Sequence, residues 1–266
     1  MGIKMIVLNT PEDVGSFAAD LFELEIKARP ACVLGLATGS TPLPLYRQLV
    51  ARCKEGRIDF SRVRTFNLDE YVGVQPDSEQ SYRHYMEKYL FSRVNIDRAN
   101  TFIPDGAAPD PERAASDFEE ELSARGGIGL QLLGLGNNGH IGFNEPLSSF
   151  ASRTRVVPLA PHTREQNAGN FGGDPENVPT TAITMGVGTI LEAKEALLIV
   201  TGAHKAEILA RVVEGPLASR VTATALQLHP NCHVLVDEDA AAQLEMSDFI
   251  RGSAVHHPLW KNYLNA

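Results

Sequence analysis

The sequence predicts an α/β fold, a doubly wound and mainly parallel sheet with helices on both faces and an irregular lid segment. Short apolar runs of strand length alternate with helical patterns along most of the chain, which is typical of crossover units in a parallel sheet. The 266 residues show no internal repeat or long flexible linker, and 43% of them are hydrophobic, enough for one large core. We therefore treat residues 1–266 as a single domain with a lid at about 160–182.

Five apolar runs are predicted strands, and four patterns between them are predicted helices. The first strand, Ala31–Ala37, leads through a Gly/Ser/Thr turn into a helix with Thr41 as its N-cap and Pro42 at its first position. Between Thr163 and Thr180, glycine, asparagine and proline residues leave little helical or strand periodicity, which indicates a functional lid or an exposed variable loop. The remaining strands are expected at 63–68, 128–135, 196–200 and 234–236, and the remaining helices at about 80–91, 110–122 and 203–213.

Charge and composition exclude several classes of protein. A net charge of −9 leaves no basic face to replace phosphate counterions, so we expect no nucleic-acid partner. No apolar run approaches the roughly 20 residues of a membrane span, and the N-terminus lacks the pattern of a signal peptide, so we expect no membrane partner. The three cysteines are odd in number and far apart, which fits buried thiols in the cytoplasm. His229 and His233 have metal-like spacing, but Pro230 disrupts the helix that would align them, so we expect no metal site.

Three unusual segments follow predicted strands, at the end of a parallel sheet where ligands bind. The first is Thr38-Gly39-Ser40-Thr41, which combines a flexible backbone, hydroxyl donors and the start of a helix. These are the features that a phosphate or sugar phosphate requires, although an ordinary capped turn has them too. The lysine and the spacing of a Walker loop are absent.

The second segment, Asn67-Leu68-Asp69-Glu70-Tyr71, places adjacent acids at the end of a strand. A carboxylate buried there is costly unless it is paired or used. Asp69 is therefore a candidate base that moves a proton on a bound substrate, with a solvated loop acid as the alternative.

The third segment runs from Gly134 to Pro146 and contains four glycines together with His140 and Glu145. Its opening matches G-x-G-x-x-G after a strand, which raises dinucleotide binding as an alternative. That alternative needs a continuing helix and an acid roughly 20 residues further on, and the sequence provides neither. We interpret His140 and Glu145 instead as an imidazole beside an orienting carboxylate, a pair suited to acid/base work near neutral pH.

Lys205 lies at the start of a predicted helix just after the strand at 196–200. It is a candidate phosphate contact, with a solvated surface lysine as the alternative.

Together these segments resemble the glucosamine-6-phosphate deaminase family (glucosamine/galactosamine-6-phosphate isomerases). The resemblance spans nearly the whole chain and includes LGLATGSTP, TFNLDEYVG, GLGNNGHIGFNEP, SSFASRTR, AITMGVGTIL and LQLHP in family order. It implies a doubly wound α/β fold with a lid and conversion of glucosamine 6-phosphate to fructose 6-phosphate and ammonia. It also implies that no metal or organic cofactor is required.

The resemblance assigns roles to individual residues. Asp69 is implied as the base that moves a proton between the second and first carbons of the opened sugar. His140 is implied as the acid/base that opens the pyranose ring, supported by Glu145 and Asn138. The phosphate is implied to be held by Gly39, Ser40, Thr41 and Lys205, next to Thr38.

Three positions depart from the family pattern. Asn138 stands where many members have Asp. Because Asn carries no negative charge, it stabilises a protonated His140 less than Asp would. Gly169 stands where members commonly place a phosphate-binding lid arginine, so the phosphate depends more on the loop and Lys205. Val157 replaces a basic residue of the allosterically regulated members, which argues against activation by an N-acetylated sugar phosphate.

Several alternatives stay open at the level of sequence. The galactosamine epimer is a second substrate candidate, and a 6-phosphogluconolactonase is a second reaction. Those lactonases usually have Asp-Glu-Arg instead of Asp69-Glu70-Tyr71 and a different ending to the glycine-rich turn. A sensor without catalysis is a third class, but there is no evident helix-turn-helix segment before Ala31. The sequence leaves homo-oligomerisation open and assigns no role to His256, His257 and Trp260.

Overall fold

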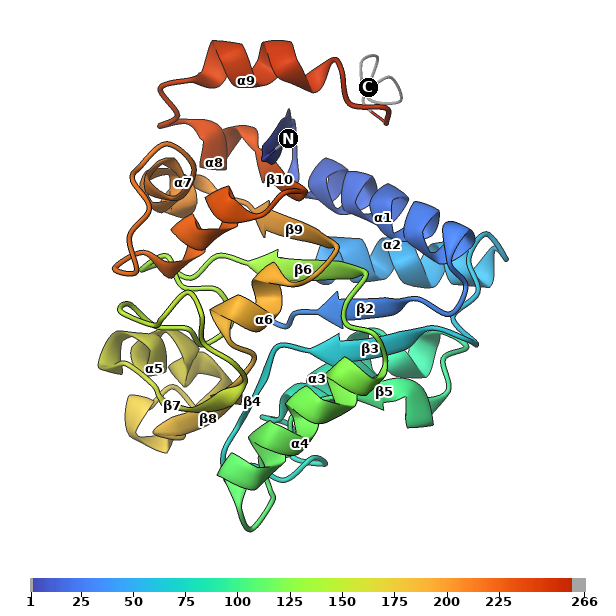
Figure 1. Ribbon diagram of the computed structural model, residues 1–266, viewed down its shortest axis with the longest axis vertical. Helices are drawn as coiled ribbons and strands as arrows, with labels where there is room; N and C mark the ends of the chain where they lie inside the picture. Colours follow the sequence, from blue (N-terminus) through green and yellow to red (C-terminus); the bar gives the residue numbers. More distant parts are fainter. Residues whose placement is uncertain (1, 260–266) are drawn as a thin grey trace.

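The computed structural model describes residues 2–259 and is organised around a parallel sheet (Figure 1). The strand order is β1-β10-β9-β6-β2-β3-β5, and every neighbouring pair is parallel. The strands are β1 (Ile3–Leu8), β2 (Val33–Leu36), β3 (Arg64–Asn67), β5 (Thr101–Phe102), β6 (Leu130–Gly134), β9 (Glu195–Val200) and β10 (Cys232–Asp237). Since β9 and β10 are buried along nearly their whole length and most of their residues are apolar, they lie in the main core.

Helices cover this sheet on both faces, as the sequence predicts (Figure 1). The longest, α1, begins with a capping box in which Thr10 and Asp13 bond each other's backbone, and α1 packs along α2. The helices outside the lid are α1 (Pro11–Ala28), α2 (Leu43–Lys54), α3 (Tyr82–Tyr89), α4 (Pro111–Ala124), α6 (Val187–Leu191), α7 (Ala206–Val213), α8 (Glu238–Ala241) and α9 (Ser247–Ala254).

A second, antiparallel sheet of order β4-β8-β7 lies beside the carboxyl ends of β2 and β3 (Figure 1). Its strands are β4 (Asp69–Tyr71), β7 (Arg155–Pro158) and β8 (Thr181–Thr184). The chain passes from β3 to β4 through Leu68, which bonds Leu36 on one side and Met185 on the other. Asp69 therefore lies at the point where the chain leaves the large sheet and enters the small one.

The predicted lid contains more regular structure than the sequence indicates. It begins with the helix α5 (Pro161–Asn167), which continues into 3₁₀ turns at Ala168–Phe171 and Pro175–Asn177. Its apolar side chains join those of the small sheet in a cluster separate from the main core, which we call the lid cluster: Tyr71, Phe143, Val157, Leu159, Ala168, Val178 and Ala182.

The five predicted strands are confirmed, with ends within two residues of those expected, and so are the four predicted helices. The expectation that Thr41 caps α2 is wrong. The residue before the first turn is Pro42, whose backbone has φ −79° and ψ −4°, and no side chain accepts a capping hydrogen bond from the free amides. The helix predicted from 203 begins instead with a 3₁₀ turn, Ala203–Lys205.

Two findings concern membranes and metals. Within residues 2–259, no helix has the length and apolar character needed to cross a bilayer. In the same part of the chain, no group of three or more His, Cys, Asp or Glu side chains is arranged to hold a metal ion. His229 has a structural role, because its Nδ1 accepts from the Asn231 amide and its Nε2 lies 2.8 Å from the Ala193 carbonyl.

Candidate active site

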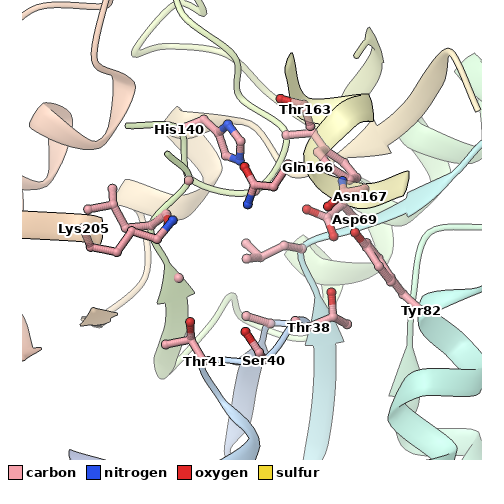
Figure 2. Close-up of a pocket in the computed structure, with 18 of the residues that line it drawn as sticks. Thr38, Ser40, Thr41, Asp69, Tyr82, His140, Thr163, Gln166, Asn167 and Lys205 are labelled. Atoms are coloured by element: carbon pink, nitrogen blue, oxygen red, sulfur yellow. The ribbon is translucent and has the colours of Figure 1, made fainter. Parts of the chain in front are cut away.

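A cavity of about 260 Å³ opens where the strands of the large sheet end and the lid begins (Figure 2). Loops after β2, β3, β6 and β9 supply one part of its wall, and α5 supplies another. Ligands bind at this edge in open parallel sheets. The side chains and glycines that line it include Thr38, Gly39, Ser40, Thr41, Asp69, Tyr82, Gly136, His140, Gly142, Thr163, Gln166, Asn167, His204 and Lys205.

Asp69 projects into this cavity from the start of β4 (Figure 2). It is only 7% exposed, and burial together with the neighbouring charge of Glu70 raises the pKa of its carboxyl to about 8. Gly142 lies against it, since a Cβ at that position would be 3.4 Å from Asp69 Oδ2 and 2.9 Å from Thr184 Oγ1. A carboxyl of this kind is suited to exchanging a proton with a substrate near neutral pH.

His140 lies on the glycine-rich turn after β6, and its ring packs directly over Gly136. A Cβ at Gly136 would lie 2.3 Å from His140 Nε2, so only glycine permits this ring position. The backbone amide of His140 donates to Asn138 Oδ1 at 3.2 Å. Within residues 2–259, no helix follows this turn directly, so the geometry required for dinucleotide binding is missing.

Glu145 stands behind His140 rather than in the cavity wall. Its Oε2 lies 3.5 Å from His140 Nδ1 and accepts a 2.8 Å hydrogen bond from Asn138 Nδ2, while its Oε1 accepts from Thr163. Burial opposes ionisation of Glu145, but the contacts with His140, Thr163 and Asn138 outweigh it and lower the pKa to about 2. Glu145 is therefore a carboxylate at all physiological pH values.

The loop from Thr38 to Thr41 forms the wall below the cavity in Figure 2. Gly39 has φ +97°, and its carbonyl accepts a 2.6 Å hydrogen bond from the Tyr85 hydroxyl, which holds the loop. The loop leads into the N-terminus of α2, where the free amides carry partial positive charge. An anion fits this wall.

Lys205 extends across the cavity from Asp69 (Figure 2). Its ammonium donates to the Leu135 carbonyl at 2.8 Å and to Asn137 Oδ1, and burial lowers its pKa to about 8. Both acceptors are uncharged, so a phosphate dianion would supply the counter-charge that the ammonium lacks here.

The structure brings the predicted site residues together in two layers. Those expected to touch substrate, including Thr38, line the cavity, whereas Asn138 and Glu145 lie behind His140 and contact it. Sequence reasoning missed six polar side chains that line the cavity: Tyr82, Thr163, Gln166, Asn167, Thr201 and His204. Three of these belong to α5, where the sequence indicated a lid or an exposed loop but no particular contact residue.

Two of the three positions that depart from the family pattern, Gly169 and Val157, lie away from the cavity. Gly169 is exposed on the 3₁₀ turn after α5, and Val157 is buried in the lid cluster.

His257 packs against Phe17 and His233, and burial lowers its pKa to about 4. Trp260 lies outside the described residues.

Comparison with known proteins identifies the same family as the sequence motifs. A family model described as "Glucosamine-6-phosphate isomerases/6-phosphogluconolactonase" matches residues 10–235. The chain belongs to this family. Glucosamine-6-phosphate deaminase of Cellvibrio japonicus is 47% identical over 94% of the chain and 94% of its own length. The protein of that name from Arthrobacter sp. is 45% identical over 97% of the chain and 99% of its own length.

Solved structures of the family separate into near and distant relatives. A monomeric glucosamine-6-phosphate deaminase is 41% identical, with a TM-score of 0.87 over 91% of this chain and 100% of that one. The 6-phosphogluconolactonase of Trypanosoma brucei covers 91% of this chain and 98% of its own, with a TM-score of 0.70 but 21% identity. The likeness to the lactonase is one of fold alone.

Proposed function

We propose that the chain converts glucosamine 6-phosphate and water to fructose 6-phosphate and ammonia, an aldose–ketose isomerisation coupled to deamination. The observation that carries this proposal is that Asp69 and His140 project into one cavity from separate turns of the fold (Figure 2). The relatives at 45–47% identity are named for this activity, and they match the chain over nearly its full length. Three unpaired cysteines support a cytoplasmic location.

The phosphate is placed at the wall formed by Ser40, Thr41 and Lys205. Hydroxyl groups, the free amides of α2 and the ammonium of Lys205 all donate to phosphate oxygens. With the phosphate fixed there, the other end of the sugar reaches toward Asp69 and His140 on the far side of the cavity.

His140 then opens the pyranose ring. The hydroxyl group on the first carbon loses its proton, and the ring oxygen gains one. The bond between the first carbon and the ring oxygen breaks, which leaves an aldehyde. An imidazole accepts and returns protons near neutral pH, and the Glu145 carboxylate behind it stabilises the cationic form.

Asp69 carries the isomerisation. Its carboxylate takes the proton from the second carbon while the oxygen on the first carbon gains a proton from solvent and becomes an enol hydroxyl. Asp69 then returns its proton to the first carbon as the amino nitrogen gives up one proton to solvent. The second carbon is left as an imine, which one water molecule hydrolyses to the ketone with release of ammonia. The burial of Asp69 excludes water from the carboxyl group that exchanges this proton.

Ammonia release from glucosamine 6-phosphate tests the proposal, with galactosamine 6-phosphate and 6-phosphogluconolactone as comparison substrates. We expect ammonia and fructose 6-phosphate from the first, and no hydrolysis of the lactone. Asp69→Asn should lower kcat by roughly 10²- to 10⁴-fold with little change in KM, because the amide cannot accept the proton. A folded wild-type chain that releases ammonia from neither amino sugar would contradict the proposed function.

A further inference from the structure

The lid helix α5 is joined to the acid/base residues through a single carboxylate. Thr163 lies within α5, is 1% exposed, and donates its hydroxyl to Glu145 Oε1. The backbone amide of Ala160, the residue just before α5, points to the same oxygen at 3.4 Å. One oxygen of Glu145 is thus held by the lid alone.

The other oxygen of Glu145 serves the glycine-rich turn. Oε2 accepts from Asn138 at 2.8 Å and lies 3.5 Å from His140 Nδ1, and Asn138 in turn accepts from the His140 backbone. The carboxylate therefore bridges the lid and the glycine-rich turn, and it is the polar link between them beside the apolar contact of Phe143 in the lid cluster. Since a carboxylate is planar and rigid, losing the partner of one oxygen frees the other to rotate away from the imidazole.

Asn138 cannot maintain this arrangement by itself. Its amide supplies one hydrogen bond to Oε2, which leaves rotation of the carboxylate about that contact unopposed. The Thr163 hydroxyl fixes the second oxygen, and it is the closest donor to it, with the Ala160 amide further away. Both hydrogen bonds have a charged acceptor and are therefore stronger than bonds between neutral groups, and together they fix both oxygens of the carboxylate.

We propose that Thr163 is a positioning residue that orients Glu145 behind His140, so that the ring-opening imidazole is assembled only while α5 is seated on the site. The proposal rests on the proposed function and deepens it. It makes the lid part of the ring-opening step, and it leaves proton transfer by Asp69 independent of Thr163.

The first experiment compares two substrates in three variants. Thr163→Val removes the hydroxyl at constant shape, Thr163→Ser restores it, and Thr180→Val changes an exposed lid threonine as a matched control. One substrate is glucosamine 6-phosphate. The other is 4,5-dideoxyglucosamine 6-phosphate, which has no ring to open and reports deuterium exchange at its second carbon.

We expect Thr163→Val to lower kcat/KM for glucosamine 6-phosphate about tenfold, equivalent to about 1.4 kcal/mol. Exchange in the dideoxy compound should stay at the wild-type rate, since it needs Asp69 but no ring opening. Thr163→Ser should recover most of the loss, and Thr180→Val should change neither rate.

The second experiment is a double-mutant cycle with Glu145→Gln. If Thr163 acts through the Glu145 carboxylate, adding Thr163→Val to Glu145→Gln should cost almost nothing further. A role of Thr163 in lid folding alone would make the two losses multiply.

Two results would overturn the inference while leaving the proposed function intact: equal slowing of both substrates by Thr163→Val, or multiplicative losses in the cycle. Wild-type turnover of glucosamine 6-phosphate, measured in the same series, keeps the two claims distinct. If the wild-type chain releases no ammonia, the proposed function fails and the positioning role fails with it.

Discussion

Asp69 and Glu70 are neighbours in the sequence with different roles in the structure. The Glu70 carboxylate accepts from the backbone amides of Tyr71 at 2.9 Å, Tyr82 at 3.1 Å and Arg83 at 3.1 Å. It thereby caps the start of α3 and fixes Tyr82, which lines the cavity. Burial raises the pKa of Glu70, and its three amide hydrogen bonds act in the opposite direction.

The pH dependence of kcat/KM follows from two buried groups. Asp69 accepts a proton only as a carboxylate, and its pKa is raised to about 8. We therefore expect kcat/KM to rise as the pH increases through that value. Lys205 attracts phosphate only as an ammonium, so with a pKa lowered to about 8 its contribution should fall above that value. We therefore expect a narrow, bell-shaped pH profile of kcat/KM, with its maximum near pH 8.

Glu70→Gln tests how this bell arises. Removing the charge beside Asp69 should lower the pKa of Asp69 and move the acid limb to lower pH, while the alkaline limb stays in place. Other ionisable groups near this pair are Tyr71, Tyr82 and Arg83. Glu112→Gln, an exposed change on α4, serves as the control. An acid limb that does not move in Glu70→Gln would show that Glu70 has no electrostatic effect on the base.

At the level of elements, the turn after β6 depends on a glycine that faces Asp69. Gly142 has φ +54°, and a Cβ there would lie 2.9 Å from Thr184 Oγ1. Gly142→Ala should lower stability by about 1–2 kcal/mol and reduce kcat by more than about tenfold, because Asp69 and Thr184 must shift. Gly127→Ala has a similar backbone requirement, φ +74°, with open space around it, and should affect stability alone. Equal kcat values in the two variants would contradict this assignment.

Local patterns sufficed for five of the seven strands of the large sheet but not for the small sheet. β2, β6, β9 and β10 consist mostly of buried apolar residues, and such runs predict buried parallel strands, whereas β3 (RTFN) is indicated by Phe66 and the flanking Val63 and Leu68. By contrast, β4 has three residues, and its partner β8 lies more than 100 residues further along the chain. No local period specifies that pairing. β1 and the N-terminus of α1 could also be predicted from local signals, an apolar run and the capping threonine Thr10.

The candidate site shows the same division. Asp69, His140 and Lys205 follow strands of the large sheet, so their convergence at one edge follows from topology. Thr163 belongs to a polar helix whose position is set by the small sheet and the lid cluster. Its contact with Glu145 depends on that tertiary placement, which no spacing in the sequence indicates.

At the level of the whole molecule, the apolar core is divided unequally. The main core extends through the seven strands of the large sheet and the helices on its two faces. The lid cluster has seven buried members and is held to the site by contacts such as that between Thr163 and Glu145. Free energies of local opening follow the amount of buried apolar surface, so the lid should open more readily than the sheet.

Hydrogen exchange measures this difference directly. In the free protein, amides of residues 161–178 should exchange faster than those of β9 and β10. Because Thr163, Gln166 and Asn167 line the cavity, a bound sugar phosphate contacts the lid and stabilises its seated position. At a fructose 6-phosphate concentration of about 100 times Kd, exchange in the lid should slow by up to about 100-fold. Peptides from α9, which lies far from α5 in Figure 1, should not change. Lid amides already as protected as those of β9 in the free protein would mean that α5 stays seated without ligand, and ring opening would then need no lid movement.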